Sequence, residues 1–209
     1  VGEVSDALEK VYGRHRADTQ KVTGVYAAAY DSAEGWEQLK TEIADFATAP
    51  DGSSLGRAVV SLTQAAQWAA GFGVRLALEF RGGDAFCSCL DTALTLVEQC
   101  REPNVGVCLD LFHYYKGPSK PEDLDRLTAA NLFHVQVCDV AGVPRELMTD
   151  ADRVFPGEGD FRPEPVLGRL KEISYAGAVS LELMNPTLWG LKGSQVVELG
   201  LTALRRMLG

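Results

Sequence analysis

The sequence predicts an α/β protein built on a parallel sheet with crossover helices. Short apolar runs alternate along the chain with longer amphipathic stretches, the order expected of repeated strand–helix units. The apolar runs are nearly continuous, which is typical of strands covered on both faces. Open doubly wound sheets and closed (β/α) barrels both fit this pattern. The sequence holds neither of the two glycine-rich nucleotide-binding motifs, so it does not support a nucleotide site.

Apolar runs at five places are expected to form strands, and amphipathic segments between them are expected to form helices. The expected strands are residues 22–29, 74–79, 105–110, 132–137 and 178–183. The expected helices are residues 6–16, 34–47, 55–71, 85–99, 121–128, 163–173 and 196–208. In the third helix Val59, Leu62 and Ala66 recur at helical spacing. Residues 139–161 are expected to form a long loop.

Composition limits the class of protein. The 209 residues suit a single domain, 1–209, with a sizeable core. With 20 basic and 29 acidic residues, the net charge of −9 argues against nucleic acid and anionic membranes as partners. No apolar run approaches the roughly 20 residues that span a bilayer. The first residues lack the basic and apolar regions of a signal peptide.

The number and positions of the cysteines indicate the redox state of the compartment. The five cysteines are an odd number, and three of them lie in or beside apolar runs, which indicates buried, reduced thiols. We therefore expect a cytoplasmic protein. Cys87 and Cys89 form a Cys-x-Cys pair with no second Cys or His pair nearby, so a structural role is favoured over zinc binding.

Four expected strands carry a metal-capable side chain at or near their C-terminal end: Glu79, Asp110, Gln136 and Glu182. With a period of two, each shares a face with small or polar residues, while the opposite faces are aliphatic. In barrels the active site lies at these strand ends. Three carboxylates and one amide oxygen are hard ligands that suit Mg²⁺, Mn²⁺ or Co²⁺. A lone acid at a strand end is more often a loop cap, but burying three carboxylates together without a cation would be costly.

Other polar groups lie near these strand ends. His113 follows Asp110 by three residues, and His134 shares a face with Gln136. Arg153 lies in a loop rich in glycine and proline. His134 is equally well explained as a hydrogen-bonded histidine inside the barrel, and Arg153 as a surface salt bridge. His15 lies in an early polar helix and is expected to be exposed.

Five pieces of the sequence together resemble the xylose isomerase-like TIM barrels grouped as sugar phosphate isomerases and epimerases. They are residues 76–79, 106–113, 133–139, 153–159 and 175–183. The resemblance implies that one divalent ion (Mn²⁺, Mg²⁺ or Co²⁺, with Zn²⁺ as a further candidate) is held by Glu79, Asp110, Gln136 and Glu182. The third ligand is often His in this family, and Gln matches hydroxypyruvate-isomerase-like and some dehydratase members. By the same resemblance, His113 and Arg153 contact substrate oxygens, and His134 is a further candidate for that role.

The chemistry that the resemblance implies is proton transfer next to a carbonyl through an enediolate, in carbohydrate metabolism. Glu79 and Glu182, facing each other across the barrel, suit removal and return of the proton. The substrate would be a small polyhydroxylated carbonyl compound, and manganese is a typical metal.

The sequence departs from the family in its strand count, since a complete barrel has eight strands. Five to six βα units are visible, so we expect a barrel that lacks its N-terminal units and is shortened near residues 47–55. Open strand edges favour association, so a homo-oligomer is expected.

Three alternatives to the isomerase remain. A dehydratase of the inosose or 3-dehydroshikimate type shares the metal set, but Phe80 and Arg81 stand where such relatives often have His. An endonuclease IV-like protein needs many His ligands and a basic surface, whereas this chain has 3 His and a charge of −9. A degenerate barrel without catalytic activity is the third alternative.

Overall fold

The computed structural model describes residues 54–209. The expected helices at 6–16 and 34–47, the expected strand at 22–29 and His15 lie outside the described residues. The chain divides into two units, Val1–Val74 and Arg75–Gly209. The described part of the first unit is helix α5 (Ser54–Ala70), within one residue of the predicted 55–71. It ends in a turn in which Val74 N–H donates to Ala69 O at 3.0 Å, and Gly73 supplies the positive φ of +67° that this turn requires.

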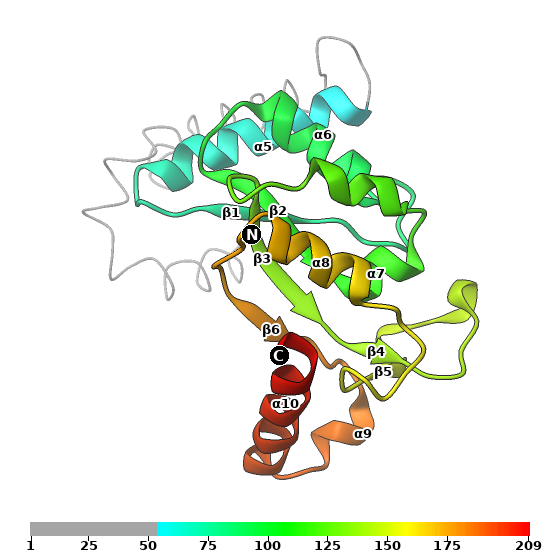
Figure 1. The fold of residues 1–209 in the computed structure, drawn as a ribbon. Coiled ribbons are helices and arrows are strands. Elements are labelled where there is room, and N and C mark those ends of the chain that lie inside the picture. Colours follow the sequence, from blue (N-terminus) through cyan, green and yellow to red (C-terminus); the bar gives the residue numbers. More distant parts are fainter. Residues whose placement is uncertain (1–53) are drawn as a thin grey trace, which may run out of the picture. The chain divides into compact units, whose positions relative to one another are not determined.

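The second unit is built on a four-stranded parallel sheet in the order β1-β2-β3-β6 (Figure 1). The strands are Leu76–Glu79, Val105–Asp110, Leu132–Val137 and Val179–Leu181. Strands that follow one another in the chain are neighbours in the sheet, whereas a doubly wound sheet reverses its strand order. The described sheet is therefore a sector of an α/β barrel, as the sequence predicts.

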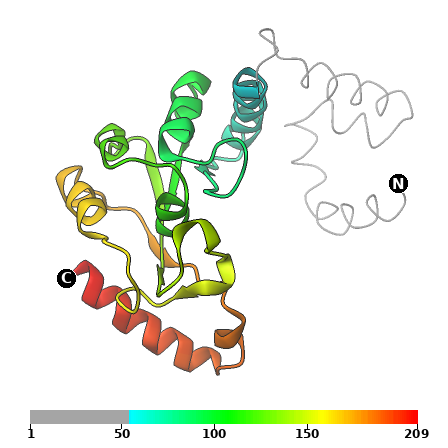
Figure 2. The ribbon, with the colours of Figure 1, turned by 90° about the vertical axis from the view of Figure 1, so that its right-hand side faces the viewer.

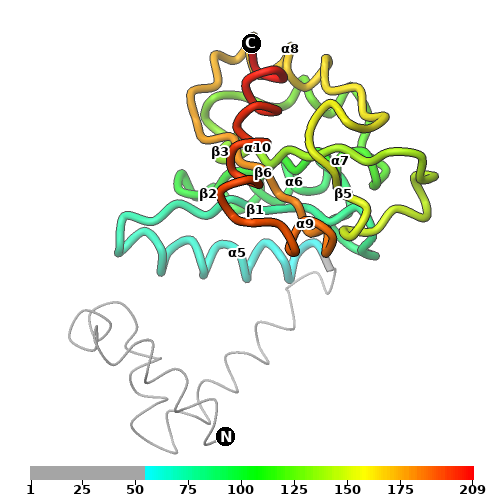
Figure 3. The backbone as a smooth tube through the Cα atoms, turned by 90° about the horizontal axis from the view of Figure 1, so that it is seen from below, coloured from blue at the N-terminus to red at the C-terminus, as the bar shows by residue number. Residues whose placement is uncertain are grey.

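The helix layer covers the aliphatic face of the sheet. Helix α6 (Leu90–Cys100) buries six apolar residues and packs against β1 and β2. Val107, Leu109 and Val135 are fully buried in the sheet, as the strand pattern predicts. On the opposite face Ala77 is exposed, so this face is the more open one. The C-terminal end of helix α10 (Gly193–Leu208) lies near α8 (Glu164–Glu172) (Figures 2 and 3). Residues of both helices line one cavity.

Several boundaries differ from the prediction for local reasons. The helix expected at 85–99 begins at Leu90, because Arg81 N–H donates to Cys87 O and Cys87 takes a φ of 53°, which closes a turn there. The segment Pro121–Arg126 is a 3-10 helix rather than an α-helix, and Asp123 caps the N–H of Lys120 at 2.8 Å. Helix α9 (Pro186–Trp189), capped by the side chain of Asn185, was not predicted.

The predicted loop at 139–161 contains an antiparallel ribbon of β4 (Asp139–Val140) and β5 (Arg153–Val154). The buried carboxylate of Asp139 accepts hydrogen bonds from the backbone N–H groups of Val140, Gly157 and Phe161 at 2.9, 3.0 and 3.0 Å. These bonds fold the loop back on the strand end. The ribbon thus fixes the position of Arg153.

Two further findings concern the described residues. All five cysteines are free, and Cys100, Cys108 and Cys138 are buried, as expected. Among residues 54–209, none of the helices combines the length and apolar character that crossing a membrane requires.

Candidate metal centre and active site

Three carboxylates gather at the C-terminal edge of the sheet. Glu79 and Asp110 are the last residues of β1 and β2. Glu182 follows β6, and its backbone N–H continues the strand pairing by donating to Val137 O at 3.2 Å. Because the carboxyl ends of parallel strands meet at one edge of a sheet, residues far apart in the sequence come together here.

A guanidinium lies between two of these carboxylates. Arg153 Nη1 is 2.8 Å from Asp110 Oδ2 and 3.2 Å from Glu182 Oε2. Its Cζ lies over the Phe112 ring, 4.2 Å from the ring centre. Only 1% of the Arg153 side chain is exposed. The interpretation of Arg153 as a surface salt bridge is therefore wrong, because this side chain belongs to the buried centre of the site.

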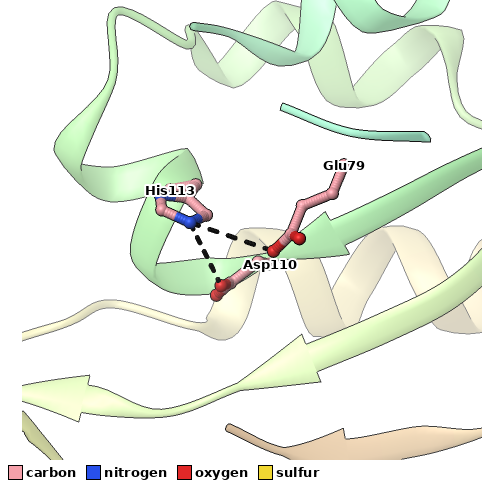
Figure 4. Close-up of side chains that lie close together, drawn as sticks. All are labelled: Glu79, Asp110 and His113. Atoms are coloured by element: carbon pink, nitrogen blue, oxygen red, sulfur yellow. Dashed lines mark ion pairs between the residues drawn. The ribbon is translucent and has the colours of Figure 1, made fainter. Parts of the chain in front are cut away.

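Glu79, Asp110 and His113 form the group that could hold a cation (Figure 4). One ligand atom from each lies within 4.8 Å of the others. Oε1 of Glu79 is buried and has no hydrogen-bond partner among the described residues. Burial, followed by the charge of Glu182, raises the pKa of Glu79 above its ordinary value. A buried oxygen of this kind is costly unless a donor or a cation reaches it.

Asp110 is a fully buried acid beside other acids. Burial raises its pKa to about 7, a contact with Glu182 adds to this rise, and the charge of Arg153 opposes it. Its Oδ1 accepts the N–H of Phe112 at 2.8 Å and so caps helix α7 (Leu111–Lys116). The crowded, poorly solvated carboxylates therefore favour a bound positive charge.

His113 faces this centre as a neutral ring. Burial, followed by the charge of Arg153, lowers the pKa of His113 to about 4, so the imidazole is uncharged at neutral pH. Its Nδ1 accepts the N–H of Gly82 at 3.3 Å. The ring proton therefore lies on Nε2, which is 3.8 Å from both Glu79 Oε1 and Asp110 Oδ2. A protonated Nε2 can donate to a substrate oxygen, so this geometry favours a substrate contact over metal ligation.

The two remaining predicted residues lie on β3. Gln136 is the register partner of Asp110, and its Oε1 accepts a hydrogen bond from the Cys108 thiol at 3.0 Å. One lone pair of that oxygen stays available to a cation. His134 lies two residues earlier in the strand, with Nε2 2.8 Å from the hydroxyl of Ser180. It is hydrogen-bonded within the sheet, and its predicted contact with substrate stays a prediction.

The residues present fit a divalent cation. Glu79, Asp110, Gln136 and Glu182 offer hard oxygen donors, and the unpartnered Glu79 Oε1 marks where positive charge would be stabilising. Three residues that contact Arg153 or Gln136 were not among the predicted site residues: Asp150, Phe112 and Cys108. Asp150 stands three residues before Arg153, and this spacing of an acid and a base was the feature of the sequence that could have predicted their ion pair.

The described residues form a sector of an α/β barrel, and the C-terminal ends of its strands carry a group of side chains that could hold a cation. The chain belongs to the xylose isomerase-like TIM barrel family, whose sequence profile matches residues 32–207.

Two curated proteins illustrate the range of relatives. An inosose isomerase of Halalkalibacterium halodurans is 33% identical over 148 residues, which are 70% of this chain and 52% of that protein. A 3-dehydroshikimate dehydratase of Pseudomonas aeruginosa is 29% identical over 126 residues, 59% of this chain and 20% of the relative. The chain thus spans about half the length of the curated inosose isomerase that it matches.

A solved structure supports the fold. The crystal structure of the IOLI protein with a bound zinc atom aligns with a TM-score of 0.70 at 29% identity. The alignment covers 74% of this chain and 56% of that one. The zinc belongs to that protein.

Proposed function

We propose that this chain carries the catalytic edge of a divalent-metal-dependent isomerase or epimerase acting on a small polyhydroxylated carbonyl compound. The observation that carries this proposal is the buried, unpartnered Oε1 of Glu79 in a group with Asp110 and His113. The inosose isomerase among the relatives supports the reaction class.

In this proposal Glu79, Asp110, Gln136 and Glu182 hold one divalent cation, with Mn²⁺, Mg²⁺, Co²⁺ and Zn²⁺ as the candidate ions. When bound, such an ion supplies Lewis-acid polarisation of the substrate carbonyl. The third position is an amide, which adds no negative charge to the three carboxylates.

The chain's own residues then supply the proton transfer. The Glu79 carboxylate removes a proton from the carbon next to the carbonyl, and the C–H electron pair forms the C=C bond of an enediolate. Glu182, after taking a proton from solvent, gives it to the former carbonyl carbon in an isomerisation, while the hydroxyl proton passes to the other substrate oxygen. In an epimerisation it gives that proton to the opposite face of the same carbon. Glu79 then releases its proton to solvent, so both carboxylates are restored. The raised pKa of Glu79 makes its carboxylate a stronger base at neutral pH.

Two groups assist at the oxygen atoms of this substrate. The charge of Arg153, whose Nη1 is bonded to the carboxylates of Asp110 and Glu182, opposes the negative charge that develops, and the neutral His113 presents its Nε2–H as a donor beside them. Both groups are held before substrate binds, which reduces the reorganisation needed as negative charge develops.

The test is deuterium incorporation in D₂O with the full chain, a divalent salt and a panel of inosose, ketoses, hydroxypyruvate and dehydroshikimate, followed by mass spectrometry. Deuterium is expected next to the carbonyl. Glu182→Gln should retain the metal and lose turnover, while Glu172→Gln on the exposed face of α8 should behave as the unsubstituted protein. Full activity of Glu182→Gln with metal bound would contradict the assignment.

A dehydratase is the second candidate, because a 3-dehydroshikimate dehydratase is among the relatives. Phe80, buried, and Arg81 follow Glu79 directly, and neither supplies the additional acid–base group that elimination of water needs. The same panel separates the two reactions, since a dehydratase would release a product lighter by one water.

A further inference from the structure

The Arg153 guanidinium has two edges, and each edge meets a different acid. Nη1 faces the site, 2.8 Å from Asp110 and 3.2 Å from Glu182. The opposite edge faces Asp150, whose Oδ1 accepts hydrogen bonds from Nε at 3.0 Å and from Nη2 at 2.8 Å. A guanidinium is a rigid planar fork, so an acceptor that holds one edge determines where the other edge points.

On the site-facing edge every acceptor meets the single nitrogen Nη1, with Cys138 Sγ at 3.7 Å and Glu182 O at 3.5 Å in addition to the two carboxylates. Asp150 is the acceptor that holds two nitrogens of the guanidinium at once, Nε and Nη2. The centre of the Phe112 ring lies 4.2 Å from Cζ, and this contact does not distinguish one guanidinium edge from the other. Pairing of β5 with β4, and the bond from Asn185 Nδ2 to Arg153 O at 3.1 Å, hold the backbone. Without Asp150, the Nε and Nη2 donors of this buried group would lose the acceptor that they share.

Asp150 itself lies at the surface, with 44% of its side chain exposed, in the 3-10 helix Asp150–Asp152. Its carboxylate therefore adds little apolar packing to the core. We infer that Asp150 is a positioning residue, which sets the edge that Arg153 presents to the reacting centre. This inference rests on the proposed function for its catalytic consequence, but the orientation itself is measurable without substrate.

The chain offers a matched control two residues away. The Asp152 carboxylate accepts hydrogen bonds from the Thr149 N–H at 2.8 Å and the Thr149 hydroxyl at 2.7 Å, and so caps the same 3-10 helix. Asp152→Asn thus weakens the loop but keeps the acceptor of Arg153. Asp150→Asn keeps the loop's shape and removes the charge of that acceptor.

The decisive experiment is ¹H–¹⁵N NMR of the full chain, which follows the arginine Nε–H signals. Arg153→Lys assigns the signal, because the Arg153 cross-peak disappears in that variant. In Asp150→Asn we expect its Nε–H to exchange with water measurably faster, because the neutral amide oxygen of asparagine is a weaker acceptor than the carboxylate that now holds Nε and Nη2. Asp152→Asn should leave the exchange rate unchanged. An unchanged rate in Asp150→Asn, or equal acceleration in both variants, would overturn the inference.

Kinetic measurements test whether the orientation of Arg153 affects the proposed reaction. With a substrate from the panel, Asp150→Asn should lower kcat/KM by about tenfold at unchanged affinity for the cation, and Asp150→Glu should restore part of the loss. If the unsubstituted protein turns over none of the panel, the proposed function fails, and the exchange measurement still decides the role of Asp150.

Discussion

Arg153 Nη1 lies 2.8 Å from Asp110 Oδ2, and the two side chains are 1% and 0% exposed. The pair joins a ribbon strand to the end of a sheet strand, 43 residues apart in the sequence. Loop and sheet are thus connected at the site by a charged contact that water does not reach.

The first prediction concerns this pair. Arg153→Met keeps most of the volume but leaves a buried acid without its cationic partner, which typically costs about 3 to 5 kcal/mol. Urea unfolding at pH 7 should show this loss. The matched control is Arg126→Met, because Arg126 pairs with the exposed Asp91 and Glu98. Its loss should be at most about 1 kcal/mol. Equal losses in the two variants would contradict the importance of burial.

The second prediction concerns close backbone contact beneath His113. A Cβ at Gly82 would lie 2.5 Å from Gly117 N and 2.7 Å from His113 O. Gly82→Ala should therefore force the turn away from α7 and lower the free energy of unfolding by about 1 to 3 kcal/mol. Gly168, within α8, has no atom within 4 Å of the corresponding position. Gly168→Ala should be neutral or stabilising by up to about 1 kcal/mol. Thermal unfolding of both variants checks the contrast, and a neutral Gly82→Ala would refute it.

The third prediction is a pH dependence away from the site. The Tyr114 hydroxyl donates to Lys120 O at 3.2 Å, and burial raises the pKa of Tyr114 to about 12. Between pH 10 and 12 the unfolded chain releases this proton and the folded chain keeps it, so Tyr114 makes stability fall as pH rises. Tyr114→Phe should flatten that part of a stability–pH curve measured by urea unfolding. An unchanged slope would show that Tyr114 ionises normally in the folded chain.

Much of the sheet could be predicted, because each strand is marked by residues that are close together in the sequence. Strands β2 and β3 have the predicted bounds, since each is an apolar run that ends at a turn or a polar residue. Strand order followed from the alternation of strands and helices. The end positions of Glu79 and Asp110 came from the same pattern, because a period of two and one polar residue at the end of the run suffice to place them.

The contacts within the site could not be predicted in the same way. Arg153 reaches Asp110 only because the β4–β5 ribbon folds residues 139–161 back, and that pairing depends on the three backbone bonds to Asp139. Helix α7 was missed because it is six residues long, although Asp110 before Leu111 is a capping signal. The ligand and substrate roles of the site residues stay predictions.

The most direct test of the central claim is calorimetric titration of Mn²⁺ into the full chain after treatment with a chelator. One ion should bind per chain, and Glu79→Gln and Asp110→Asn should each weaken binding at least about tenfold. Glu172→Gln, at an exposed position of α8, should bind as the unsubstituted chain does. No binding, or equal binding by Asp110→Asn and the unsubstituted chain, would contradict a metal centre at the strand ends.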